Sequence, residues 1–127
     1  MSAEYDLTII GGGPVGMFAA FYAGMRNARV QLLESLPELG GQVQALYPEK
    51  IIHDVAGYPA IKCRKLVAQL EKQLTQFPID IQLASPVTDV TGAMGDFTIT
   101  TASGQQSHSK AIIVATGSGA FEPRRLA

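Results

Sequence analysis

The sequence has few of the residues from which cross-links and metal sites are built. Of its 127 residues one is a cysteine, Cys63, two are histidines, His53 and His108, and none is tryptophan. A single cysteine excludes a disulfide within the chain and a cysteine-rich metal site. The two histidines lie far apart and lack the spacing of zinc ligands, so we expect no metal site.

An excess of one charge and a long apolar run are also absent. Ten basic and eleven acidic side chains give a net charge of −1, so no general field attracts nucleic acid or an anionic membrane. The longest apolar run falls short of the ~20 residues of a membrane span, and no basic stretch precedes an apolar run at the N-terminus. We therefore expect a cytoplasmic protein with neither a nucleic acid nor a membrane as partner.

What the sequence does contain is a nucleotide-binding pattern near its N-terminus. A short apolar strand in residues 5–10 runs into Gly-Gly-Gly-Pro-Val-Gly and then into a helix. Gly11 permits a tight turn, Gly13 lets the backbone approach a phosphate, and Gly16 lets the helix pack close to the sheet. Pro14 occupies the first helical turn, where a proline costs no hydrogen bond. The free N–H groups and dipole of this helix favour an anion such as a pyrophosphate.

The flanking residues support this interpretation. Residues 15–25 are apolar almost all round, which predicts a helix buried beside a sheet, and residues 29–34 read as a second strand that ends in Glu34. A carboxylate at that point can accept hydrogen bonds from the ribose hydroxyls of an adenosine and would repel a 2′-phosphate. The alternative is a glycine turn that binds nothing, with Glu34 as a solvated strand end.

The rest of the chain reads as one α/β domain with no internal boundary. The composition, 46% hydrophobic and 17% charged, is ordinary for a globular chain of this length. Residues 37–42 form a loop with paired glycines, and residues 42–59 follow no clean period, which is typical of a binding loop. Residues 63–77 predict an amphipathic helix that lies on the sheet.

The second half of the chain predicts strands. Residues 79–83 extend the parallel sheet, and three polar-alternating segments at 86–91, 97–101 and 106–110 read as an antiparallel meander. Residues 111–115 are continuously apolar, as expected for a central parallel strand buried on both faces. The predicted fold class is therefore a Rossmann-like parallel sheet with a three-stranded antiparallel meander.

This order of elements resembles the FAD domain of the two-dinucleotide-binding flavoproteins. Residues 40–50, 54–59 and 119–124 narrow the resemblance to the thioredoxin-reductase-like ferredoxin/flavodoxin–NADP⁺ reductases of bacteria. The resemblance covers essentially all 127 residues, but only the N-terminal part of such a reductase. It implies that residues 1–127 are an incomplete FAD-binding domain, and that the NADPH-binding domain and the C-terminal FAD segment lie outside this chain.

The resemblance also assigns cofactor contacts. Glu34 would hold the adenosine ribose, Gln42 would reach the flavin end of FAD beside Gly41, and Tyr47 would lie against the isoalloxazine ring. Further contacts are implied for Asp54, for Val87 at the adenine, for Thr116 and Gly117 near the pyrophosphate, and for Phe121 beside the cofactor. Taken singly, Tyr47 is also typical of a surface turn, Gln42 of a helix start and Phe121 of a core anchor.

The implied function is transfer of electrons between NADPH and ferredoxin or flavodoxin through FAD, in a protein that the resemblance suggests is a homodimer. No side chain of this chain is expected to act as a general acid or base, and the isolated chain is expected to be inactive. Residues 42–52 hold no cysteine, which argues against disulfide reductases of the glutathione-reductase type. Three alternatives stay open: a thioredoxin-reductase-type enzyme, a non-catalytic nucleotide-binding module and a simple NAD-binding domain.

Overall fold

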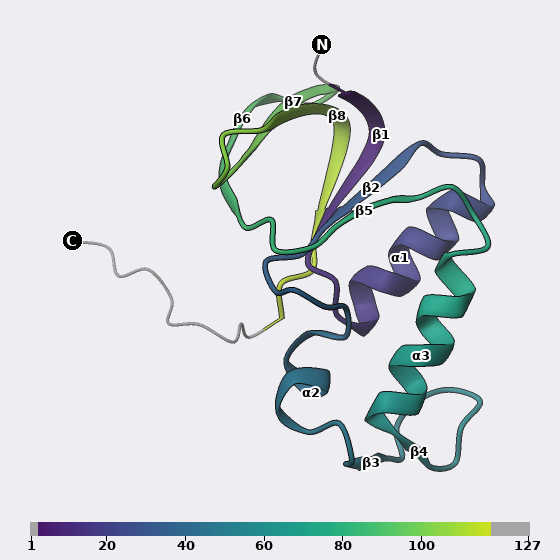
Figure 1. Ribbon diagram of the computed structural model, residues 1–127. Helices are drawn as coiled ribbons and strands as arrows, with labels where there is room; N and C mark the ends of the chain where they lie inside the picture. The colour runs from purple at the N-terminus through teal and green to yellow at the C-terminus, as the bar shows by residue number, and fades with distance from the viewer. Residues whose placement is uncertain (1–2, 118–127) are drawn as a thin grey trace.

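A single mixed β-sheet organises the fold (Figure 1). The computed structural model describes residues 3–117, and in this range six strands follow the order β5-β2-β1-β8-β7-β6, with a separate two-stranded ladder of β3 and β4. The strands are β1 (Ala3–Ile10), β2 (Val30–Leu33), β3 (Ile51–Ile52), β4 (Ile61–Lys62), β5 (Asp80–Gln82), β6 (Val87–Ala93), β7 (Asp96–Thr101) and β8 (Gln106–Val114). The helices are α1 (Pro14–Met25), α2 (Gly41–Leu46) and α3 (Cys63–Leu74).

Half of the sheet is parallel, as the sequence predicts. β1 pairs with β2 and with β8, so that Leu7 lies opposite Val30 on one side and Ala111 on the other. β2 also pairs in parallel with β5. Parallel neighbours need a crossover, and α1 and α3 provide the crossovers that lead from β1 to β2 and from β2 to β5. Both helices lie on the same face of the sheet and pack against each other (Figure 1).

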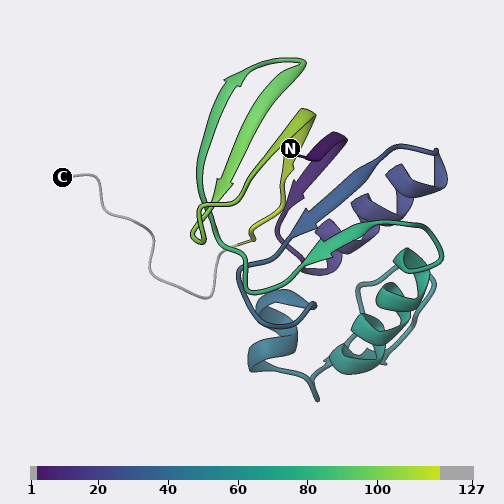
Figure 2. The same cartoon turned by 45° about the horizontal axis from the view of Figure 1, so that its top comes forward.

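The other half of the sheet is the predicted meander, with one difference. β6, β7 and β8 pair antiparallel, and the β6–β7 hairpin forms one end of the twisted sheet while β5 forms the other (Figure 2). The third meander segment and the expected central strand are one continuous strand, β8. Its first half pairs with β7 up to Ser109, whereas its pairing with β1 continues to Val114.

The prediction that residues 111–115 are buried on both faces is wrong. Ile113 is 39% and Val114 is 70% exposed. The reason is that pairing with β7 stops at Ser109. Beyond that point, within residues 3–117, no strand pairs with the edge of β8 that faces away from β1.

The core lies between the sheet and one side of each helix. Its buried members come from β1, α1, β2, the loop after β2, and α3: Ile9, Met17, Ala20, Val30, Leu32, Leu39, Val67 and Leu74. The amphipathic helix is confirmed, although α3 ends at Leu74 rather than at residue 77. α1 packs against the sheet as predicted, but only on one side, and a row of apolar side chains faces outward: Val15, Phe18, Tyr22 and Met25.

The segment after β2 has more regular structure than its sequence suggests. Residues 42–59 are predicted to be irregular, but they include most of α2 and all of β3, and Ile51 pairs antiparallel with Lys62 of β4. These elements are two to six residues long, too short to produce a detectable period. No helix within residues 3–117 has the length and apolar content to cross a membrane.

Candidate dinucleotide-binding site

The glycine loop lies where the carboxyl ends of β1, β2 and β8 meet. Gly11 follows β1, and its N–H donates to the carbonyl oxygen of Leu33 at the end of β2 (2.9 Å). Its φ of +116° lies in the region that favours glycine. A Cβ at Gly11 would also collide with the carbonyl oxygen of Ala115, which follows β8. Gly11 therefore permits both the turn and the close meeting of three chain segments.

Gly13 and Gly16 have different surroundings. A Cβ on Gly16 would collide with the carbonyl oxygen of Gly11, so α1 packs directly on the loop only because this residue has no side chain. A Cβ on Gly13 would meet only the Cα of Gly41, at 3.7 Å, and the φ of −75° at Gly13 suits any residue. The missing side chain at Gly13 thus leaves a small space between the glycine loop and Gly41.

The start of α1 faces this space without a side-chain cap. Its first helical hydrogen bond runs from the N–H of Met17 to the carbonyl oxygen of Gly13 (2.9 Å), and Pro14 occupies the first turn. Among residues 3–117, no side chain hydrogen-bonds to the N-cap position, and the first turn has no acidic residue. The first N–H groups of a helix lack partners within the helix and lie at the positive end of its dipole. This end of α1 is therefore suited to an anion.

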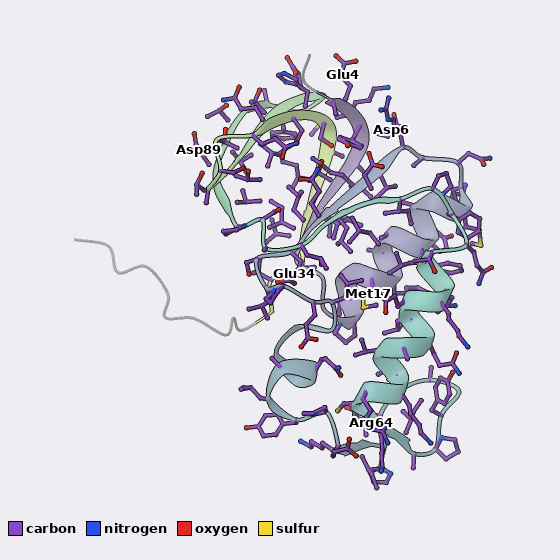
Figure 3. The ribbon with its side chains drawn as sticks, viewed as in Figure 1. Glu4, Asp6, Met17, Glu34, Arg64 and Asp89 are labelled. Carbon is purple, nitrogen blue, oxygen red and sulfur yellow. The ribbon has the colours of Figure 1, made fainter. Side chains whose placement is uncertain are left out.

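Glu34 extends β2 and directs its carboxylate at the glycine loop. One oxygen, Oε1, accepts a hydrogen bond from the N–H of Gly12 at 2.7 Å. The other, Oε2, accepts from the N–H of Leu36 at 2.8 Å and from the hydroxyl of Ser35 at 3.1 Å. Because Glu34 is 6% exposed, the alternative of a solvated strand end is wrong. Figure 3 shows Glu34 at the junction of the sheet and the loop that leads to α2.

The second pair of glycines packs on the first loop. The N–H of Gly40 donates to the carbonyl oxygen of Gly12 (2.9 Å), and Gly41 lies against the backbone of Gly13. The paired glycines thus let this loop pack closely on the protein's own glycine loop. Gly41 also begins α2, so the loop fixes where that helix starts.

The structure brings about half of the predicted site residues together. Gly11, Gly13, Pro14, Gly16, Glu34, Gly41 and Thr116 surround the start of α1, with the backbone of Thr116 next to Gly11. Four others lie in separate elements: Tyr47 after α2, Asp54 between β3 and β4, Val87 at the start of β6, and Gly117 after β8. The side chain of Gln42 and the whole of Phe121 lie outside the described residues.

Sequence reasoning missed Gly12 and Gly40. Gly12 is the residue that joins the loop to Glu34 and to Gly40 at once. A Cβ there would approach Leu39 Cδ2 to 2.8 Å and Glu34 Oε1 to 3.1 Å. The signal was present as the middle glycine of three, but the usual spacing gives that position no role.

Comparison with known proteins agrees with this geometry. The model of the pyridine nucleotide-disulphide oxidoreductase family matches residues 5–126, which is nearly the whole chain. The chain belongs to this family. The predicted α/β class, a parallel sheet joined to an antiparallel meander, is confirmed.

The curated relatives narrow the similarity. The chain is 98% identical over 127 residues to a ferredoxin–NADP reductase of Lactiplantibacillus plantarum, and it covers 38% of that protein. It is 62% identical over 126 residues to a ferredoxin–NADP reductase of Levilactobacillus brevis, again covering 38%. The chain thus spans well under half the length of these relatives.

Solved structures confirm the fold relation to thioredoxin reductases. The thioredoxin reductase of Streptococcus pyogenes superposes with a TM-score of 0.80 at 29% identity, over 92% of this chain and 36% of that one. The enzyme of Lactococcus lactis gives the same TM-score and identity, over 93% and 37% of the two chains.

Proposed function

We propose that this chain is the N-terminal part of the FAD-binding domain of an oxidoreductase that passes electrons between NADPH and ferredoxin or flavodoxin. The names of its 98% and 62% identical relatives support this proposal. Because the chain covers 38% of each, the activity is proposed for the longer protein. For that protein we also propose a homodimer and a cytoplasmic location.

The observation that carries the proposal is the space at Gly13, beside the uncapped start of α1 and the carboxylate of Glu34. A pyrophosphate fits this donor set, because the backbone N–H groups and the helix dipole of α1 favour an anion even without a lysine nearby. Glu34 fits the ribose, because Oε1 receives only the bond from Gly12 and can accept a second one. The residues of this site therefore suit an adenine dinucleotide.

The remaining contacts complete the proposed binding mode. Thr116 and Gly117 would lie along the pyrophosphate, Val87 would offer backbone groups to the adenine, and Tyr47 would cover the flavin ring and exclude water from it. Gln42, Asp54 and Phe121 are proposed to contact the cofactor as well. When bound, FAD supplies the acceptance of hydride and the release of single electrons, while the protein binds, orients and shields it.

Two experiments test the proposal. On denaturation, the longer protein should release a flavin whose absorbance spectrum matches that of free FAD. A colourless preparation that takes up no added FAD would refute cofactor binding. Gly13→Ala should weaken FAD binding at least tenfold, because its methyl group fills the proposed phosphate space. Its urea midpoint should stay close to that of the parent, since the new Cβ meets ordinary contacts only.

The choice of acceptor separates this proposal from its alternatives. The longer protein should reduce ferredoxin with NADPH and leave oxidised thioredoxin unreduced. The opposite result would favour a thioredoxin-reductase-type enzyme. If the longer protein reduces neither ferredoxin nor thioredoxin with NADPH, only a flavin-binding module would remain. We expect the 127-residue chain alone to show no NADPH-dependent electron transfer and weaker FAD binding than the longer protein.

A further inference from the structure

Positive charge gathers at one end of the molecule. Four cations lie between the end of α2 and the first turn of α3, where Figure 3 labels Arg64: Lys50, Lys62, Arg64 and Lys65. The chain as a whole has one more acidic than basic side chain. This concentration of cations therefore does not follow from the composition.

Backbone and side-chain bonds hold the cations at fixed positions. The N–H of Cys63 donates to the carbonyl oxygen of Lys50, and the N–H of Arg64 donates to that of Pro48, both at 2.9 Å. The carboxylate of Glu49 lies between two of the cations, 3.2 Å from Lys62 Nζ and 2.7 Å from Arg64 Nε. The hydrogen bond from Lys62 holds the pKa of Glu49 below its ordinary value. One ionised carboxylate thus orders two cations while the group keeps a positive excess.

The start of helix α3 does not benefit from these charges. Lys62 is the N-cap of α3, Arg64 and Lys65 lie in its first turn, and that turn has no acidic residue. Cations near the positive end of a helix dipole are unfavourable. Helix stability would favour the opposite charges at these positions, so the cations are better explained by an interaction outside the domain.

Exposed apolar side chains border the cations. Leu46, Tyr47 and Ile51 are 54%, 57% and 51% exposed. Lys50 Nζ lies 5.8 Å from the centre of the Tyr47 ring, so charge and apolar surface are in contact. Exposed aromatic and aliphatic groups among cations are typical of a protein interface rather than of a solvated surface. We call these seven residues, Leu46, Tyr47, Lys50, Ile51, Lys62, Arg64 and Lys65, the basic end.

The basic end lies close to the proposed cofactor site. α2 begins at Gly41, which packs on Gly13, and it ends at Leu46. A helix of six residues spans about 9 Å. Figure 1 shows α2, β3, β4 and the start of α3 together at this end of the molecule.

We propose that the basic end is the docking surface for an acidic electron-carrier protein, which would bind its carboxylates to the cations and its apolar rim to Leu46 and Ile51. This inference rests on the proposed function, because electrons must leave near the cofactor and Tyr47 is proposed to cover the flavin. Charge complementarity of this kind accelerates encounter and weakens as salt is added.

The test uses the longer protein with ferredoxin as the probe. Lys50→Glu and Lys65→Glu should each raise the KM for ferredoxin at least tenfold and flatten the dependence of kcat/KM on salt. Lys50→Arg and Lys65→Arg should keep the parent KM within twofold. Arg26→Glu makes the same charge change on exposed Arg26, just beyond the far end of α1, and should also leave the KM within twofold.

Reduction of a neutral quinone by NADPH, together with the flavin content, reports an intact enzyme in every variant. The proposal is overturned if an intact Lys50→Glu and Lys65→Glu protein keeps the parent KM, or if Arg26→Glu raises it equally. A parent enzyme that reduces the quinone but not ferredoxin also overturns the docking proposal, and in that case the proposal of cofactor binding still stands. Failure with both acceptors means that the proposed function itself is wrong.

Discussion

Glu34 combines a structural and a proposed binding role in one side chain. Its carboxylate accepts the N–H of Gly12 and that of Leu36, and so joins the glycine loop to the loop that follows β2. The two backbone donors would lose their partner if the carboxylate were removed. An unsatisfied buried donor costs about 1–3 kcal/mol.

Glu34→Gln should therefore destabilise the fold by about 1–2 kcal/mol, because an amide has one acceptor oxygen where the carboxylate has two. Urea unfolding measures this loss. Glu38→Gln makes the same change of charge on an exposed residue and should stay within about 0.5 kcal/mol of the parent. Equal stability of the two variants would show that the bonds from Gly12 and Leu36 contribute nothing.

Tyr5 makes the sheet sensitive to high pH. Its hydroxyl donates to Asp80 Oδ2 at 2.6 Å, and burial followed by this bond raises the pKa of Tyr5 to about 12. The folded state therefore holds the phenolic proton more tightly than the unfolded chain, whose value is near 10. The stabilisation from this group is complete below pH 10 and is lost as the pH rises towards 12.

Tyr5→Phe should lower the stability by about 1 kcal/mol at pH 8, through loss of the hydrogen bond to Asp80. The difference from the parent should shrink between pH 10 and 12, because only the parent ionises there. Urea midpoints of both proteins at several pH values measure this trend. Tyr22→Phe changes an exposed tyrosine, and a similar trend in that variant would remove Tyr5 as the cause.

At the scale of elements, the contact between α1 and the glycine loop decides whether the site forms. The helix can start where it does only because Gly16 lies against the carbonyl oxygen of Gly11. The neighbouring Gly13 has no such constraint, since a Cβ there would make only an ordinary contact with Gly41, at 3.7 Å. The fold therefore needs Gly11 and Gly16 to be glycines, whereas at Gly13 only a ligand would need the missing side chain.

Gly16→Ala should destabilise the protein by about 2 kcal/mol, because the new methyl group must push α1 away from backbone atoms that cannot yield. Gly13→Ala is the matched variant and should change the stability by about 0.5 kcal/mol or less. Thermal or urea unfolding without added cofactor separates them. Similar stabilities of the two variants would contradict the packing described for Gly16.

The elements also show how far local sequence patterns lead. The strand–loop–helix unit and α3 are predicted from periodicity and glycine spacing, because both signals arise from neighbours along the chain. The division of β8 was misjudged, since a change from polar to apolar residues at 111 marks a change of environment and not the end of a strand. The short elements α2, β3 and β4 leave no period to detect.

At the scale of the whole molecule, residues 3–117 carry two apolar surfaces outside the core in addition to that of the basic end. Val15, Phe18, Tyr22 and Met25 form a row along α1, and Ile113 and Val114 lie on β8 beyond its pairing with β7. Exposed apolar rows and unpaired strand edges favour association. The apolar sequence of residues 15–25 and 111–115 therefore does not correspond to complete burial in this structure.

We therefore expect the 127-residue chain to self-associate as its concentration rises, which sedimentation velocity would detect. Phe18→Glu should shift this equilibrium towards the monomer by placing a charge in the middle of the row on α1. Met94→Glu, in a residue that is 94% exposed at the β6–β7 turn, is the control and should have little effect. A chain that stays monomeric at all concentrations, or equal effects of both variants, would contradict this expectation.

The sequence by itself determined the glycine loop, the helix that follows it, the position of Glu34 and the parallel and antiparallel halves of the sheet. Each was predicted from a pattern of residues that are neighbours along the chain. Only the tertiary structure decided that Glu34 binds Gly12, that Gly41 packs on Gly13, and that Tyr5 bonds to Asp80, 75 residues away. It also decided that the residues of the basic end come together. These contacts join segments whose separation leaves no local pattern, and they exist only once the strands have taken their order.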